Sequence, residues 1–63
     1  MIPAVYENGE AFSKSINVNT PYKVYGRLHI GDTVIAQYYN SKIGGYDDEI
    51  SGIVLYVERF ELA

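Results

Sequence analysis

The sequence predicts an all-β protein, a small five-stranded barrel or roll that begins with an N-terminal hairpin. Three observations indicate this class: apolar and polar residues alternate in short segments, turn signals separate these segments, and tyrosine occurs seven times among 63 residues. Alternation with a period of two is typical of a half-buried strand. Tyrosine favours strands and half-exposed surfaces. Closing the sheet would protect the strand edges of so small a protein.

The first two strands are expected at about residues 3–7 and 10–13, on either side of Asn8-Gly9. Asn-Gly is a strong hairpin signal, because both residues tolerate the positive φ angles of a type I′ turn. The segment "NVNTPY" that follows is expected to be a loop, because Pro21 cannot occupy a central strand.

The next two strands are expected on either side of Gly31-Asp32, which we interpret as a tight turn. In "KVYGRLHI", Val24, Leu28 and Ile30 fall on one face, which is the face expected to be buried. In "TVIAQYY" both faces carry apolar groups, so this strand is expected to be central and covered on both sides.

The stretch "IGGYDDEISG", residues 43–52, is expected to connect two strands, with its glycines in the turn and its acids solvating the loop tip. The three acids are Asp47, Asp48 and Glu49. A phosphate site is disfavoured, since neither a lysine nor a helix start follows the glycines. A calcium or magnesium site is also disfavoured, because consecutive side chains of an extended chain point in opposite directions. Whether the acids also contact a partner stays open.

The last strand is expected in "IVLYVERFELA", where the apolar pattern changes parity. Ile53, Leu55 and Val57 share one face, whereas Phe60 and Leu62 fall on the other. A shift of one residue moves every side chain to the opposite face. The pattern therefore predicts a bulge or a sharp bend near Glu58-Arg59.

The composition limits the kinds of function that the chain can have. Eight acids against five bases give a net charge of −3, which disfavours general binding to a nucleic acid backbone. The absence of cysteine excludes disulfides and thiolate metal sites, and the single histidine, His29, excludes a histidine-rich zinc site within one chain. We expect no metal and no cofactor.

The length predicts a single domain, residues 1–63, with a marginal core. Small domains usually need reinforcement, and without disulfides or metal the remaining means is association, so we expect a homo-oligomer. No apolar stretch approaches the ~20 residues of a membrane span. No export signal is visible, so a cytoplasmic protein is expected.

The segment "GDTVIAQYYNSKIGGYDDEISGIVLYV", residues 31–57, resembles the core of an SH3-like barrel, and within that group a Tudor-type module. The matching residues are Gly31, Val34, Ala36 and Tyr38 in the first strand, and Gly52, Ile53 and Val54 in the second. The resemblance implies a small barrel that binds a partner. Where Tudor-type modules have an aromatic pair that cages methylated lysine or arginine, this chain has "DDEISG". Tyr38, Tyr39 and Tyr46 are the alternative cage.

The sharpest functional signal is a stripe of cationic and aromatic residues on the outer face of one expected strand. Its members are Lys23, Tyr25, Arg27 and His29, and Gln37 and Tyr39 would extend it on the adjoining strand. Such a face resembles a platform for single-stranded nucleic acid, where bases stack on rings. Tyrosine and arginine are also enriched at the centres of protein interfaces. The acidic net charge favours a protein partner.

The sequence therefore predicts a non-enzymatic protein-binding module, a small adaptor or inhibitor that docks on a larger protein or associates with itself. A short, acidic, cysteine-free chain resembles the adaptors and inhibitors that phages and bacteria encode. The alternative is binding of single-stranded nucleic acid or a nucleotide through Lys23, Tyr25, Arg27 and Tyr39. Catalysis is disfavoured, because there is no cysteine nucleophile and His29 has no evident serine and acid partners.

Overall fold

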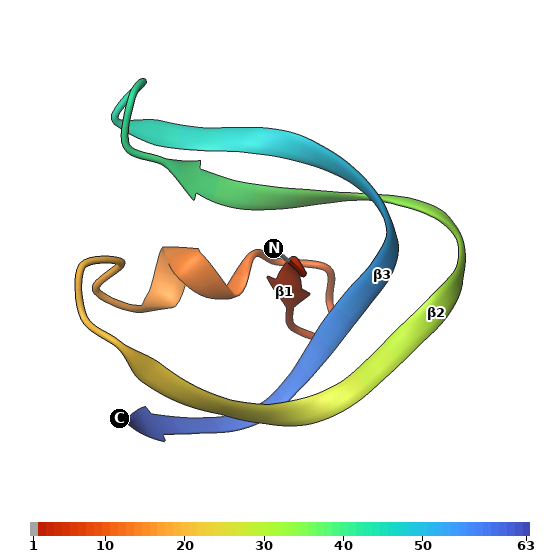
Figure 1. Cartoon of the computed structure of the whole chain (residues 1–63), viewed down its shortest axis with the longest axis horizontal. Coiled ribbons are helices and arrows are strands. Elements are labelled where there is room, and N and C mark those ends of the chain that lie inside the picture. The colour runs from red at the N-terminus through yellow and green to blue at the C-terminus, as the bar shows by residue number, and fades with distance from the viewer. Residues whose placement is uncertain (1) are drawn as a thin grey trace.

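Two long antiparallel strands, β2 (Tyr22–Asn40) and β3 (Gly45–Leu62), form most of the protein. A short strand, β1 (Ala4–Val5), and a 3₁₀ helix, η1 (Phe12–Ser15), precede them. The computed structural model describes residues 2–63. The β2–β3 hairpin curls into a C that encloses β1 and η1, as Figure 1 shows.

The strands form one open sheet in the order β1-β3-β2, with β1 parallel to β3. The predicted all-β class is confirmed. The structure has three strands in a sheet that does not close, where the sequence predicted five strands and a barrel. The structure has fewer strands than predicted for two reasons. Two of the predicted strands are one continuous strand, β2, and another is replaced in part by the helix η1. Among the described residues, no helix has the length and apolar character needed to cross a membrane.

The hairpin bends where a tight turn was predicted at Gly31-Asp32, and that prediction is wrong because β2 runs on through both residues. Ile30 pairs with Ile53 and Val34 pairs with Ser51, so β2 advances four residues where β3 advances two. Extra residues in one strand bend the pair sharply. The bend separates a near arm (residues 22–30 and 53–62) from a far arm (residues 34–40 and 45–51).

A second irregularity lies in the near arm and confirms the predicted bulge. Tyr25 pairs with Arg59 while Gly26 pairs with Val57, which leaves Glu58 without a partner in β2. The backbone approaches so closely here that a Cβ atom on Gly26 would overlap the carbonyl oxygen of Tyr56. The sequence therefore needs glycine at position 26.

The predicted N-terminal hairpin is replaced by a different arrangement. Its turn exists, with Gly9 at φ 84° and the Asn8 side chain accepting a hydrogen bond from Glu10 N, but Val5 and Ala11 form only an isolated bridge. Residues 12–13 of the strand predicted at 10–13 lie instead in η1, where Ser15 Oγ donates to Phe12 O at 2.9 Å. Such serine–backbone bonds compete with strand pairing. β1 pairs instead with Leu55 and Tyr56 of β3.

The acidic segment also differs from the prediction. The turn between the long strands is formed by residues 41–44, so of the predicted connection 43–52 only residues 43 and 44 turn, with Gly44 at φ 67°, while Gly45 and Gly52 lie in β3. The three acids lie beyond this turn, inside β3, and do not form a loop tip. Residues 17–21 of the predicted loop "NVNTPY" form a loop, and its last residue, Tyr22, begins β2.

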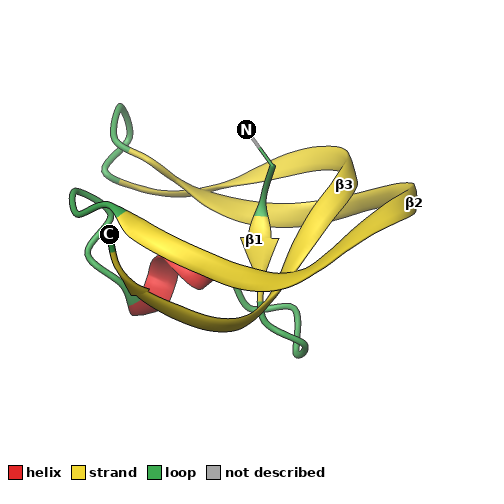
Figure 2. Ribbon diagram, turned by 60° about the horizontal axis from the view of Figure 1, so that its bottom comes forward, coloured by secondary structure: helices red, strands yellow, loops and turns green. Residues whose placement is uncertain are grey.

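The core lies inside the C and consists of two small clusters. Val5, Ala36 and Val54 are buried together, so they join β1 and both arms of the hairpin. The second cluster surrounds Phe12, whose ring lies 5.0 Å from that of Phe60, measured between centroids. Its other ring neighbours are Tyr6 and Tyr22, at 5.9 and 6.4 Å, all edge to face. Figure 2 shows η1 and β1 held between the arms.

Candidate interaction surface

The residues of the predicted stripe do not form one patch. Lys23, Tyr25, Arg27 and His29 lie in the near arm of β2. Gln37 and Tyr39 lie beyond the bend in the same strand, where their register partners in β3 are Asp48 and Tyr46. The extension of the stripe onto a neighbouring strand was therefore wrong, because β2 does not pair with itself.

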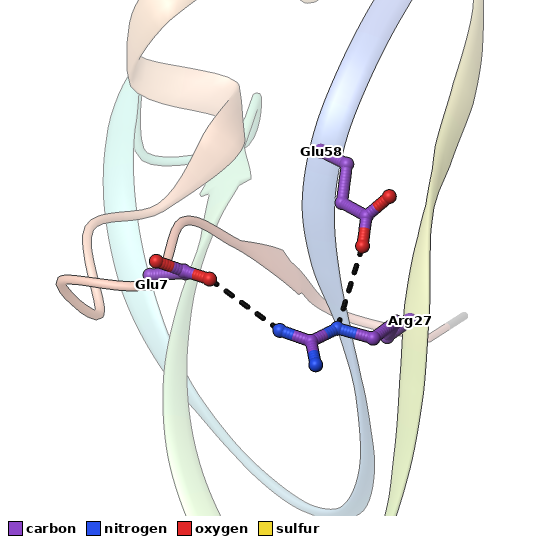
Figure 3. A network of polar contacts seen from close by, with 3 residues as sticks. All are labelled: Glu7, Arg27 and Glu58. Atoms are coloured by element: carbon purple, nitrogen blue, oxygen red, sulfur yellow. Dashed lines mark hydrogen bonds and ion pairs between the residues drawn. The ribbon is translucent and has the colours of Figure 1, made fainter.

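The arginine of the stripe lies between two acids. Arg27 Nη2 is 3.4 Å from Glu7 Oε1, and Arg27 Nε is 3.4 Å from Glu58 Oε1, as Figure 3 shows. Glu7 follows β1, and Glu58 is the extra residue of the bulge. All three side chains are exposed, so each pair contributes at most about 1 kcal/mol to stability. The pairs nevertheless give the surroundings of Arg27 a net negative charge.

The other members of the stripe also have acidic or aromatic neighbours. Tyr25 donates a hydrogen bond to Glu61 Oε1 at 3.3 Å, and the Arg59 guanidinium lies 3.8 Å from the centre of its ring. Lys23 is paired in register with the same Glu61. The ring of His29 lies edge to face with the ring of Tyr56, at 6.1 Å. The stripe is thus a mixed-charge surface.

A second surface was missed by the sequence analysis. Three aliphatic cross-strand pairs follow one another around the bend: Leu28 with Leu55, Ile30 with Ile53, and Ile35 with Ile50. Ile30, Ile35 and Ile50 are 70%, 72% and 73% exposed, and Leu28 is 51% exposed. The alternation in "KVYGRLHI" had placed Leu28 and Ile30 on a buried face, and this prediction is wrong. We call Leu28, Ile30, Ile35, Ile50 and Ile53 the bend surface.

The bend surface lies in weakly charged segments of both long strands. From residue 28 to 36 the sequence holds one ionised side chain, Asp32, and from 50 to 57 it holds none. The neighbouring segments are strongly charged, with the three consecutive acids ending at Glu49 and "ERFE" beginning at Glu58. Few charged residues therefore lie close to the exposed isoleucines in the sequence.

The backbone of β2 is also available beside the bend surface. The prediction of a central strand at "TVIAQYY" is wrong, because β2 is an edge of the sheet and pairs with β3 alone. Within residues 2–63, no other strand runs along its outer side. A long edge strand presents unpaired N–H and C=O groups that another chain can pair with.

A groove of about 380 Å³ lies between the N-terminal segment, η1 and the far arm. Tyr38, Tyr39 and the half-buried Glu49 line it, and so does Ser13, whose buried Oγ has no hydrogen-bond partner among the described residues. The ring of Tyr46 has the Lys14 ammonium 5.3 Å from its centre. Tyr39 and Tyr46 of the alternative cage lie edge to face, 5.7 Å apart between ring centroids, and the cation beside this pair is Lys14 of the chain itself.

No cluster of three or more histidine, cysteine, aspartate or glutamate side chains suitable for a metal ion occurs among residues 2–63. Comparison with known proteins found no matching family model, no matching curated protein and no matching solved structure.

Proposed function

We propose that this protein is a non-enzymatic protein-binding module, an adaptor or inhibitor that docks through the bend surface. The observation that carries the proposal is the directly paired Ile35 and Ile50, each more than 70% exposed. Burying apolar surface against a partner gains roughly 25 cal/mol per Å². Large exposed aliphatic side chains gathered at one bend of a small protein are typical of an interaction site.

The shape of the hairpin supports this function. The exposed isoleucines stand on paired strands, so their backbone is ordered before a partner arrives. Preorganisation reduces the entropy lost on binding. The edge of β2 offers main-chain hydrogen bonds beside the same surface, which is how extended peptides add to a sheet. The relation to SH3-like and Tudor-type barrels remains a proposal that rests on the segment 31–57.

Single-stranded nucleic acid or a nucleotide is the second candidate, because Tyr25 and Arg27 are both exposed on the near arm. Stacked bases contribute about 1–3 kcal/mol each. Glu7, Glu58 and Glu61 lie against these cations and rings, and they would repel a phosphate backbone. We therefore place a protein partner first.

Capture experiments with the immobilised protein, with and without nuclease, test the proposal. Replacing Ile35 and Ile50 together by serine should abolish capture of a protein partner, while Ile43→Ser should not, because Ile43 is equally exposed but lies in the turn. Capture that is lost after nuclease treatment would favour nucleic acid. Micromolar oligonucleotide binding that is abolished by Arg27→Ala and weakened by salt would replace the proposal, because phosphate contacts release counterions.

A further inference from the structure

The accessible surface of the chain is larger than that expected for a folded monomer of the same mass. Its accessible surface is 4510 Å², whereas a folded monomer of 7.1 kDa exposes about 4,100 Å² by the general relation of surface to mass. Six apolar residues are buried among residues 2–63, while twelve large apolar residues are more than a third exposed. A single copy therefore leaves apolar area that association would cover.

We propose that the occupant of the bend surface is a second copy of this chain, in a two-fold symmetric dimer. The inference rests on the proposed function, which assigns that surface to protein binding, and it names the partner. In a two-fold dimer the same patch meets itself, so the patch must complement itself. Aliphatic surface satisfies this condition, because each isoleucine is met by equivalent apolar groups of the partner.

The distribution of charge favours this contact. Two copies, each of net charge −3, repel one another unless their acids stay apart. Contact through the acidic stretch 47–49, or near Glu7 and Glu58, would bring like charges together. Residues 28–36 carry one carboxylate, Asp32, and residues 50–57 carry none, so two copies repel least when they meet through these segments and the acids 47–49 stay at the border of the contact.

The chain has enough accessible surface to form a dimer contact of standard area. Specific dimers of standard size bury about 800 Å² on each partner, which would be about a sixth of the 4510 Å² exposed by this chain. The bend surface lies next to the outer edge of β2. Two-fold symmetry makes a strand meet its own copy antiparallel, which allows backbone hydrogen bonds to add to the apolar contact.

Sedimentation equilibrium over a wide concentration range tests the dimer. The wild-type chain should pass from 7.1 kDa to twice that mass. The Ile35→Ser/Ile50→Ser variant should stay monomeric until about thirty times higher concentration, since removing central anchors costs about 2 kcal/mol. Ile43→Ser is the matched control and should associate like the wild type. Circular dichroism of each variant confirms that the fold is kept.

Protection of an introduced cysteine from alkylation is a second measurement. Unlike the serine substitutions, it keeps an apolar side chain at the substituted position. The chain has no cysteine, so Ile35→Cys and Ile43→Cys each carry one thiol. Alkylation at position 35 should slow as concentration rises, because the partner covers it. Alkylation at position 43 should proceed at the same rate throughout.

Two results would overturn the inference. One is a wild-type chain that stays at monomer mass at every concentration. The other is a dimer whose dissociation constant does not change when residue 35 is replaced and whose formation does not slow alkylation at position 35. If the chain is monomeric but Ile35→Ser/Ile50→Ser still abolishes capture of another protein, the proposed function stands and only the identity of the partner is wrong. If the dimer forms through the bend and no other protein is captured, the module is a self-association device.

Discussion

The near and far arms are built from the same two strands, yet the near arm buries two valines, whereas the buried apolar residue of the far arm is Ala36. In the near arm, Val54 is 2% exposed and Val57 is 7% exposed. In the far arm, the cross-strand pair Ile35 and Ile50 is almost fully exposed. The near arm is covered by β1 and η1, whereas the far arm meets them through fewer residues, such as Ala36 and Tyr46. Burial in this protein therefore depends on what covers a strand, more than on the strand's own residues.

The largest effect is expected for Phe12→Ala, in η1, where the ring packs against Tyr22 and Phe60 of the near arm. Phe12 is buried and meets three aromatic rings, and truncating such a residue costs about 3–5 kcal/mol of unfolding free energy. Denaturant titration followed by circular dichroism measures the loss. Phe60→Ala is the matched control, and it should cost less because Phe60 is 41% exposed. Equal losses would contradict the central place given to Phe12.

A smaller loss, about 1–3 kcal/mol, is expected for Gly26→Ala, because the new methyl group forces the backbone at the bulge to shift. Gly45→Ala makes the same change in the far arm, where nothing lies within 4 Å of the added Cβ. It should be neutral or slightly stabilising. Thermal melts of the two variants compare the arms directly. If both variants have the same melting temperature, the close approach of the backbone at Gly26 does not restrict the residue at this position.

Tyr46→Phe examines how the far arm is held to the rest of the molecule. The Tyr46 hydroxyl donates a hydrogen bond to Ser13 O at 3.0 Å, and losing it should cost about 1 kcal/mol. Amide hydrogen exchange should become faster in residues 45–50 and stay unchanged in residues 54–57. Tyr39→Phe, on the ring that lies 5.7 Å from Tyr46, is the control. Unchanged exchange in both arms would show that this bond does not anchor the far arm.

The smallest effect is expected for Arg27→Ala. Both of its ion pairs are exposed, at 3.4 Å, so their loss should cost between 0 and about 1 kcal/mol. Salt screens exposed pairs, so the difference in melting temperature from the wild type should shrink as ionic strength rises. A large, salt-independent loss would mean that the Arg27 stem stabilises the near arm by packing.

The sequence contained enough to predict the all-β class, the turn that ends at Gly44 and the bulge at Glu58, because each depends on neighbours in the chain. It did not allow the bend to be distinguished from a turn, since Gly31-Asp32 is compatible with both. Alternation separates the two faces of a strand, but it does not say which face is covered. Leu28 and Ile30 were therefore placed in the core although both are exposed.

The candidate site was predicted in part. Lys23, Tyr25, Arg27 and His29 do lie on one strand, as the period of two required. Their acidic neighbours come from distant segments: Glu7 from the turn after β1, and Glu58 and Glu61 from the end of β3. Such contacts depend on the tertiary fold. The bend surface could have been suspected from the uncharged segments 28–31 and 50–57, which are rich in isoleucine.

The parallel pairing of β1 with Leu55 and Tyr56 has a consequence for the order in which the protein forms. The β2–β3 hairpin closes through a short turn, so its first contacts are local and quick to find. β1 and its partners in β3 are separated in the sequence by the whole of β2, so a ribosome must release all of β2 before they can meet. Contacts between such distant segments slow folding. Docking of the N-terminal segment should therefore be the last step, after the hairpin is in place.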